Sequence, residues 1–80
     1  MDELIKDFGA RVQQLRKSQQ VSQEAFAQQA GIDRSYYGRI ERGAANPTLR
    51  NIGSIAKCLG LSISELFDGI PAKESKRKRR

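Results

Sequence analysis

Residues 22–43 restrict the fold of this chain more than any other stretch, because a single glycine separates two short amphipathic segments. In the first segment Phe26 and Ala30 lie four residues apart, and in the second Tyr37 and Ile40 lie three apart. These spacings place each apolar pair on one face of a helix, with polar residues opposite. The stretch therefore predicts two short helices joined by a tight connection.

The junction between the two segments predicts a sharp turn. Gly31 stands where the first helix must stop, and glycine adopts a left-handed C′ conformation at little steric cost. Ser22 and Asp33 are suitable N-caps for the two helices. Ala27 has only a methyl group, which lets the second helix cross closely over the first. So short a connection excludes antiparallel packing and predicts a helix-turn-helix.

The second helix of this pair is expected at residues 34–42, and it presents a polar face that suits DNA. The residues on this face are Arg34, Ser35, Gly38 and Arg39. Arginine has the shape for bidentate contact with guanine in the major groove. We therefore interpret the chain as a sequence-specific, double-stranded DNA-binding domain.

The net charge of +6 is distributed unevenly along the chain. Residues 71–80 hold six of the fifteen Lys and Arg residues and one of the nine Asp and Glu residues. We expect this basic tail to be disordered, since it has like charges and no apolar periodicity. It either strengthens DNA binding through counterion release or is an inert solubilising segment, and a nuclear-import signal is the weaker alternative. Within the fold, the arginine cluster comprises Arg34, Arg39, Arg42 and Arg50.

The cysteine and histidine content excludes several classes of site. One cysteine and no histidine leave no disulfide within the chain and no Cys/His zinc site. Cys58 is expected to be a small, partly buried hydrophobe rather than a reactive thiol, because no histidine is available as its base. We expect no enzyme activity, no cofactor, no metal and no small-molecule ligand.

No apolar run reaches the roughly 18 residues that a membrane span needs. The acidic, periodic N-terminus is also unlike a signal peptide. We therefore expect a cytoplasmic protein with no membrane partner, associated with the nucleoid through DNA.

Apolar spacing predicts an all-α domain of five helices over residues 1–70. The helices are expected at about residues 3–18, 23–30, 34–42, 49–59 and 63–68. The first has the stripe Ile5, Phe8, Val12 and Leu15, and the fourth has Leu49, Ile52, Ile55, Ala56 and Leu59. Polar residues of the first helix, such as Arg11, are expected to face solvent. Gly53 is expected to permit a close helix contact.

The fourth and fifth helices carry start signals of their own. Thr48 can cap the fourth helix, and Ser62 with Glu65 forms a capping box for the fifth. The apolar residues of the fifth segment are Ile63, Leu66, Phe67 and Ile70. Part of this surface must complete the core, and the remainder is a candidate homodimer interface.

Helix N-termini provide candidate phosphate contacts, because their free N–H groups attract anions. We assign Ser22 and Gln23 at the second helix, and Arg50 and Asn51 at the fourth, to the DNA backbone. For Gln23 the alternative is a solvated residue in the first turn.

Taken in order, the segments VSQEAFAQQAGIDRSYYGRIERG, NPTL and LGLSISELF resemble the lambda repressor and Cro-like regulators of bacteria and phages. The resemblance covers about residues 8–69. DRSYYGRIERG is most similar to the small controller proteins of restriction–modification systems. The family implies a compact five-helix fold and a two-fold homodimer that represses or activates from its operator. In such dimers the half-sites lie about 34 Å apart.

The resemblance also implies roles for individual residues. Arg34, Ser35 and Arg39 fall where the family reads base edges, flanked by Asp33 and Tyr36. Gln23 falls on a glutamine that holds phosphate and braces the recognition helix. Arg42, Asn46 and Arg50 fall along the DNA backbone, and Arg16 and Glu41 match a buried ion pair of some members.

Two residues depart from the family pattern. Tyr37 replaces an aliphatic residue, so its hydroxyl must reach a partner or water. Gly38, midway along the recognition helix, either allows close approach to DNA or only softens the helix. The alternative function is an antitoxin or adaptor that uses this fold to bind protein. The chain offers little apolar surface beyond the fifth helix for such a partner.

Overall fold

The computed structural model describes residues 2–70 of the chain, and within that range it is entirely helical and irregular, without strands. The helices are α1 (Asp2–Ser18), α2 (Gln23–Ala30), α3 (Arg34–Glu41), α4 (Leu49–Leu59) and α5 (Ile63–Leu66). The prediction of five helices is confirmed. The expected basic tail at 71–80 lies outside the described residues.

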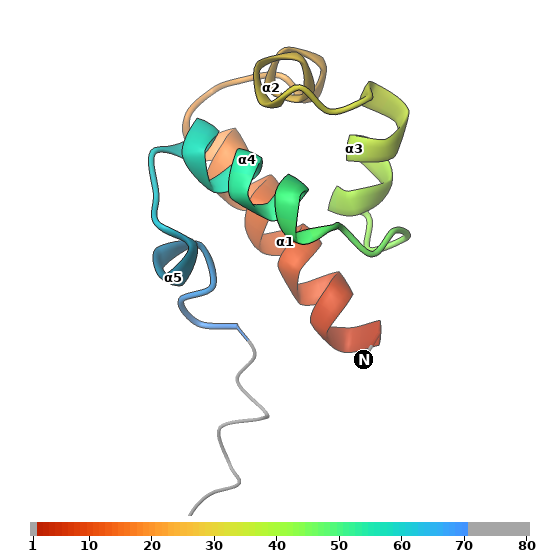
Figure 1. Cartoon of the computed structure of the whole chain (residues 1–80), viewed down its shortest axis with the longest axis vertical. Coiled ribbons are helices and arrows are strands. Elements are labelled where there is room, and N and C mark those ends of the chain that lie inside the picture. Colours follow the sequence, from red (N-terminus) through yellow and green to blue (C-terminus); the bar gives the residue numbers. More distant parts are fainter. Residues whose placement is uncertain (1, 71–80) are drawn as a thin grey trace, which may run out of the picture.

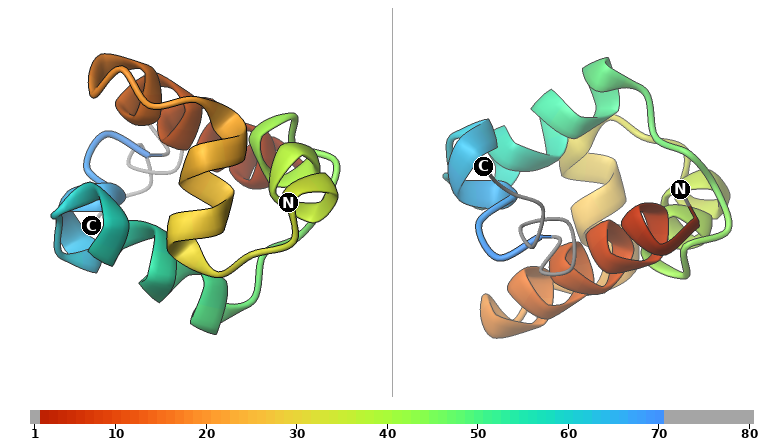
Figure 2. Two further views of the ribbon diagram at one scale, coloured as in Figure 1. Left: turned by 90° about the horizontal axis from the view of Figure 1, so that it is seen from above. Right: turned by 90° about the horizontal axis from the view of Figure 1, so that it is seen from below.

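The five helices surround one core, with α3 and α5 at opposite ends of the domain (Figures 1 and 2). α3 packs against α1 and α2, and α5 packs against α4. α4 in turn contacts both α1 and α2. This arrangement leaves the outer side of α3 uncovered by any other described helix.

The core is built from the apolar stripes of all five helices. Its largest fully buried side chains are Tyr37, Phe26, Ile40, Ile55, Leu66 and Val12. The rings of Phe26 and Tyr37 lie 5.3 Å apart between centroids, in a tilted arrangement that joins α2 to α3. The aromatic residue at position 37 therefore packs in the centre of the core.

Local capping sets where the helices begin and end. Each of four N-cap side chains accepts a hydrogen bond from a backbone N–H in the first turn of its helix. These N-caps are Ser22, Asp33, Thr48 and Ser62. Ser62 also forms the capping box with Glu65. Gly31 and Gly60 end α2 and α4 in the left-handed conformation. These predictions are confirmed.

Gly9 allows the close crossing of α1 over α3. A Cβ on Gly9 would collide with the backbone carbonyl oxygen of Ile40 and lie 2.7 Å from that of Glu41. Both obstacles are backbone atoms, which cannot move aside as a flexible side chain can. The bare face of Gly9 therefore brings α1 against the C-terminal end of α3.

Two predictions about α4 were wrong. Leu49 belongs to the predicted apolar stripe, but it is 75% exposed, because the first residue of α4 lies beyond the edge of the core. Gly53 does not permit a close helix contact, since a Cβ there would meet nothing within 4 Å.

The fifth helix is shorter than predicted, since α5 ends at Leu66 and not at residue 68. Arg11 does not simply face solvent: its guanidinium donates to the carbonyl oxygens of Leu66 (3.1 Å) and Glu65 (3.0 Å). These bonds satisfy carbonyls at the end of α5. The chain then turns through Gly69, which has a φ of 86°.

None of the helices in residues 2–70 has the length and apolar character required to cross a membrane.

Gly9 and Gly53 form a matched pair of glycine-to-alanine tests. We expect Gly9→Ala to lower the free energy of unfolding by about 1–3 kcal/mol or more, because α1 and α3 must separate. Gly53→Ala should raise it by about 0.5–1 kcal/mol, since the site is open and alanine favours helix. Urea unfolding of both variants measures the difference. Equal effects would contradict the proposed close approach at Gly9.

Candidate nucleic-acid interface

The outer side of α3 carries a concentration of exposed basic side chains. A hollow of about 210 Å³ lies on this side, and its lining is Gln23, Arg34, Ser35, Gly38, Arg39 and Arg42. Three of these residues are arginines and none is acidic. We call the surface formed by these six residues the basic face. The structure thus brings together residues that the sequence assigned separately to base edges and to phosphates.

The two N-caps beside this hollow have local structural tasks. Asp33 Oδ2 accepts the N–H of Tyr36 at 3.1 Å, and Ser22 Oγ accepts the N–H of Ala25 at 3.0 Å. Asp33 is therefore engaged in starting α3, the helix that carries the arginines. Both side chains lie at the surface, next to the basic face.

Two side chains of α3 bind the loop that follows it. The hydroxyl of Tyr36 donates to the carbonyl oxygen of Asn46 at 3.1 Å, and Arg39 Nη2 donates to that of Ala44 at 3.3 Å. These bonds hold the loop close to the basic face. Arg39 has five N–H donors, so one bond to the loop leaves others for a ligand.

The start of α4 adds a further exposed arginine. Thr48 Oγ1 accepts the N–H of Asn51 at 3.1 Å and so caps the helix. Arg50 is exposed in this first turn, while Asn51 is half-buried. This helix start continues from the loop that Tyr36 and Arg39 hold.

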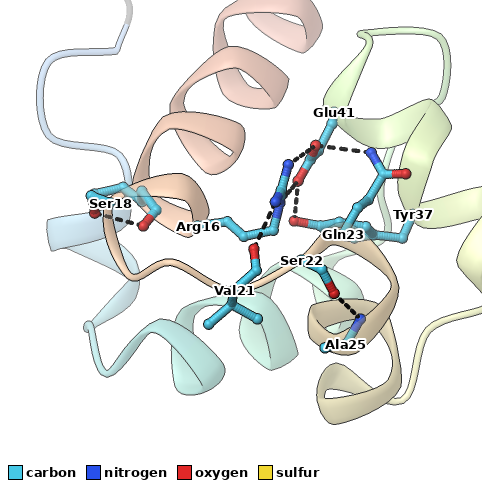
Figure 3. Close-up of polar contacts among 9 residues, drawn as sticks. Arg16, Ser18, Val21, Ser22, Gln23, Ala25, Tyr37 and Glu41 are labelled. Carbon is cyan, nitrogen blue, oxygen red and sulfur yellow. Dashed lines mark hydrogen bonds and ion pairs between the residues drawn. The ribbon is translucent and has the colours of Figure 1, made fainter.

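Behind the basic face, a buried ion pair joins α1 to α3. Arg16 Nε donates to Glu41 Oε2 at 2.7 Å, and Arg16 Nη2 donates to Glu41 Oε1 at 3.1 Å (Figure 3). Arg16 Nη1 also donates to the carbonyl oxygen of Val21 at 2.7 Å, just before α2. The pair that the family resemblance implied is present, and it includes the connection between α1 and α2.

Glu41 accepts two further hydrogen bonds. The hydroxyl of Tyr37 donates to Oε2, and Gln23 Nε2 donates to Oε1 at 3.1 Å. Tyr37 thus has the hydroxyl partner that its burial required. The expected brace between Gln23 and the recognition helix is also present, and its partner is the buried carboxylate.

This network shifts the pKa values of its members. Burial by itself would raise the pKa of Glu41, but hydrogen bonds from Arg16, Tyr37 and Gln23 outweigh it and lower the pKa below its usual value. The hydrogen bond to Glu41 raises the pKa of Arg16 despite its burial. Burial, together with the bond to Glu41, raises the pKa of Tyr37. The carboxylate is therefore ionised and the phenol neutral at pH 7.

The apolar surface of the C-terminal segment differs from the predicted dimer interface. Leu66 has no exposed surface and belongs to the core, so its assignment to an interface was wrong. Phe67 stacks on Phe8 with ring centroids 5.2 Å apart and is half-buried. Ile63 is 46% exposed, and Ile70 is half-buried. Leu66 is covered because it faces inward from α5.

Sequence reasoning missed several contacts that position this region. Three residues contact partners 31 or more positions away in the chain, namely Gly9, Arg11 and Gln19. Gln19 Nε2 donates to the carbonyl oxygen of Leu59 at 3.1 Å. Their polar or small character carries no local signal for such partners. Only the tertiary arrangement of the helices identifies these contacts.

Comparison with known proteins places this geometry among DNA-binding regulators. The family HTH_3, described as helix-turn-helix, matches residues 12–66. The chain is 42% identical to the control protein C.MunI of Mycoplasma sp. over 71 residues, which are 88% of this chain and 96% of that protein. It is also 42% identical to the control protein C.BamHI of Bacillus amyloliquefaciens over 62 residues, 76% of each chain.

A solved structure supports the same assignment. The restriction–modification controller protein C.AhdI from Aeromonas hydrophila has a TM-score of 0.76 and 43% sequence identity to this chain. The match covers 84% of this chain and all of that one.

The ion pair makes a pH-dependent prediction. Arg16→Met leaves the Glu41 carboxylate buried without its cation, and we expect a loss of about 3–5 kcal/mol in unfolding free energy at pH 7. The folded state lowers the pKa of Glu41 below 4.5, the ordinary value for a glutamate. Its contribution to folding stability is therefore fully present above pH 4.5 and is lost as the pH falls through the folded-state pKa. The difference in unfolding free energy between Arg16→Met and the wild type should therefore become smaller at acidic pH.

Urea unfolding at pH 7 and at about pH 3 measures this difference. Lys17→Met, an exposed neighbour on α1, is the control and should have little effect at either pH. A difference for Arg16→Met that stayed constant with pH would assign the loss to packing instead of charge.

Proposed function

Since the chain belongs to the helix-turn-helix family HTH_3 and is a DNA-binding transcriptional regulator rather than an enzyme, we propose that it binds a two-fold symmetric operator as a homodimer. In this proposal α3 enters the major groove of each half-site. The observation that carries it is the uncovered outer side of α3 with its arginine-lined hollow. Its similarity to control proteins further suggests that it acts as a stand-alone regulator, repressing or activating by the position of its operator.

We propose that Arg34, Ser35 and Arg39 read base edges. All three are exposed on α3 and line the same hollow. Arginine contacts guanine bidentately, and serine can serve any base. Tyr36 and Asp33 flank them in supporting positions, where Tyr36 fixes the loop and Asp33 caps the helix.

Phosphate contacts are proposed around this reading surface. The candidate residues are Ser22, Gln23, Arg42, Asn46, Arg50 and Asn51, which lie at the starts of α2 and α4, at the end of α3 and in the loop between α3 and α4. Free N–H groups of the two helix starts add to the attraction for anions. Such contacts fix the register of α3 in the groove without reading sequence.

The dimer is proposed to form through the exposed apolar side of the C-terminal segment. Ile63 is its most exposed large residue, and the half-buried Phe67 and Ile70 extend the surface. An operator with two-fold symmetry requires a second copy in the same orientation on the second half-site. α5 lies at the opposite end of the domain from α3, so a partner there leaves the reading face open (Figure 2).

Replacing Arg39 with alanine tests base reading. We expect discrimination between the preferred and a random duplex to fall by about 1–3 kcal/mol, because a bidentate base contact is lost. Arg50→Ala is the matched control and should weaken binding to both duplexes equally. Anisotropy titrations of both proteins on both duplexes, at one salt concentration, give the comparison. Equal losses for Arg39→Ala would make Arg39 a phosphate contact.

Replacing Ile63 with lysine tests the dimer surface. Because Ile63 is 46% exposed, the lysine can reach solvent without disturbing the core, and we expect monomers in analytical ultracentrifugation. Leu49→Lys is the control, since Leu49 is more exposed and lies at the start of α4, away from α5 (Figure 1). Dimers of unchanged affinity in Ile63→Lys would place the interface elsewhere.

A further inference from the structure

The Glu41 carboxylate determines how the amide of Gln23 is oriented. An ionised carboxylate only accepts hydrogen bonds, so the amide nitrogen of Gln23, and not its oxygen, must face Glu41. The observed bond, Nε2 to Oε1 at 3.1 Å, has this orientation. With two bonds from Arg16 and one from Tyr37, all four acceptor positions of the carboxylate are filled.

The consequence is that Gln23 turns its carbonyl oxygen toward the basic face. Figure 3 shows this oxygen on the side of the amide away from Glu41. A Cβ added to Gly38 would lie 3.3 Å from Gln23 Oε1 and 3.3 Å from Arg42 Nη1. The Gln23 oxygen and the Arg42 nitrogen therefore both lie over the bare surface of Gly38, which is buried.

An outward carbonyl oxygen suits a cation better than a phosphate. Oxygen Oε1 of Gln23 and a phosphate oxygen are both acceptors, so they cannot bond to each other. The hollow contains guanidinium donors, and Arg42 is the one that shares the surface of Gly38 with Gln23. Arg42 directly follows α3 and lies four residues after Gly38, a spacing that places two residues on the same side of a helix.

We propose that Gln23 is a positioning residue that orients the guanidinium of Arg42 toward the DNA backbone, and that Gly38 provides the space for this contact. The proposal rests on the proposed function, because it refines the phosphate contacts of the same site. For Gln23 it replaces the direct phosphate contact proposed above, so that Gln23 acts on the DNA backbone through Arg42. The buried Arg16–Glu41 pair thereby acts on the surface through Gln23.

The salt dependence of DNA binding tests the proposal in the full chain. A neutral glutamine that only donated to phosphate would release no counterion, whereas Arg42 releases about one. We expect Gln23→Ala to reduce the slope of log K against log salt by about 1, as Arg42→Ala does. The double variant should show no further reduction. The probe is the duplex that the wild-type protein prefers.

Two variants complete this experiment. Gln29→Ala removes an exposed glutamine of α2 that lies beside Ser54 and Cys58, away from the basic face, and it should leave the slope unchanged. Gly38→Ala should lower the slope as Gln23→Ala does, because its methyl group displaces both side chains. A Gln23→Ala protein with weaker binding and an unchanged slope would overturn the proposal, as would additive losses in the double variant.

A measurement without DNA separates this proposal from the function on which it rests. In the free protein, the Nε–Hε NMR signal of Arg42 should move toward its random-coil position in Gln23→Ala and stay in place in Gln29→Ala. An unmoved signal in Gln23→Ala overturns the positioning role, whatever the DNA result. A wild-type protein that bound no duplex would overturn the proposed function alone, and this signal would still decide the role of Gln23.

Discussion

The carboxylate of Glu41 is the point at which three parts of the domain meet. It accepts two bonds from Arg16 of α1, one from Gln23 at the start of α2 and one from Tyr37 of α3. Arg16 extends the network to the carbonyl oxygen of Val21. Burying these charges is costly, and a docking of α1 and α3 that separated Arg16 from Glu41 inside the protein would leave both charges unpaired. The network thus fixes the position of α3.

The fixed position of α3 explains the shape of the basic face. Gly9 allows the backbones of α1 and α3 to touch, and the ion pair lies beside that crossing. On the other side of α3, Tyr36 and Arg39 hold the following loop. A helix supported from both sides holds the backbone positions of its arginines fixed, which favours the precise geometry that base reading requires. The helices therefore act as a rigid support for a small set of side chains.

Local signals in the sequence predicted the helices and their ends, whereas contacts between distant residues had to be seen in the structure. The N-caps were predictable because a capping side chain bonds within the first turn of the helix that it starts. They are Ser22, Asp33, Thr48 and Ser62. Arg11 bonds to α5 more than 50 residues away, and no pattern around it indicates this. Apolar periodicity also failed at the edges of the core, where it assigned Leu49 to the interior and Leu66 to an interface. The buried Arg16–Glu41 pair was reached through family resemblance, since its partners lie 25 residues apart.

Selection of bound duplexes from a randomised DNA pool by the purified 80-residue protein tests the central claim most directly. A homodimer with α3 in the major groove should enrich a two-fold symmetric site whose half-sites are centred about 10 bp apart. Guanines at the positions facing Arg34 or Arg39 would connect that site to the basic face. Salt-sensitive binding without any enriched motif would contradict the account, because it would show a domain that binds DNA through charge alone.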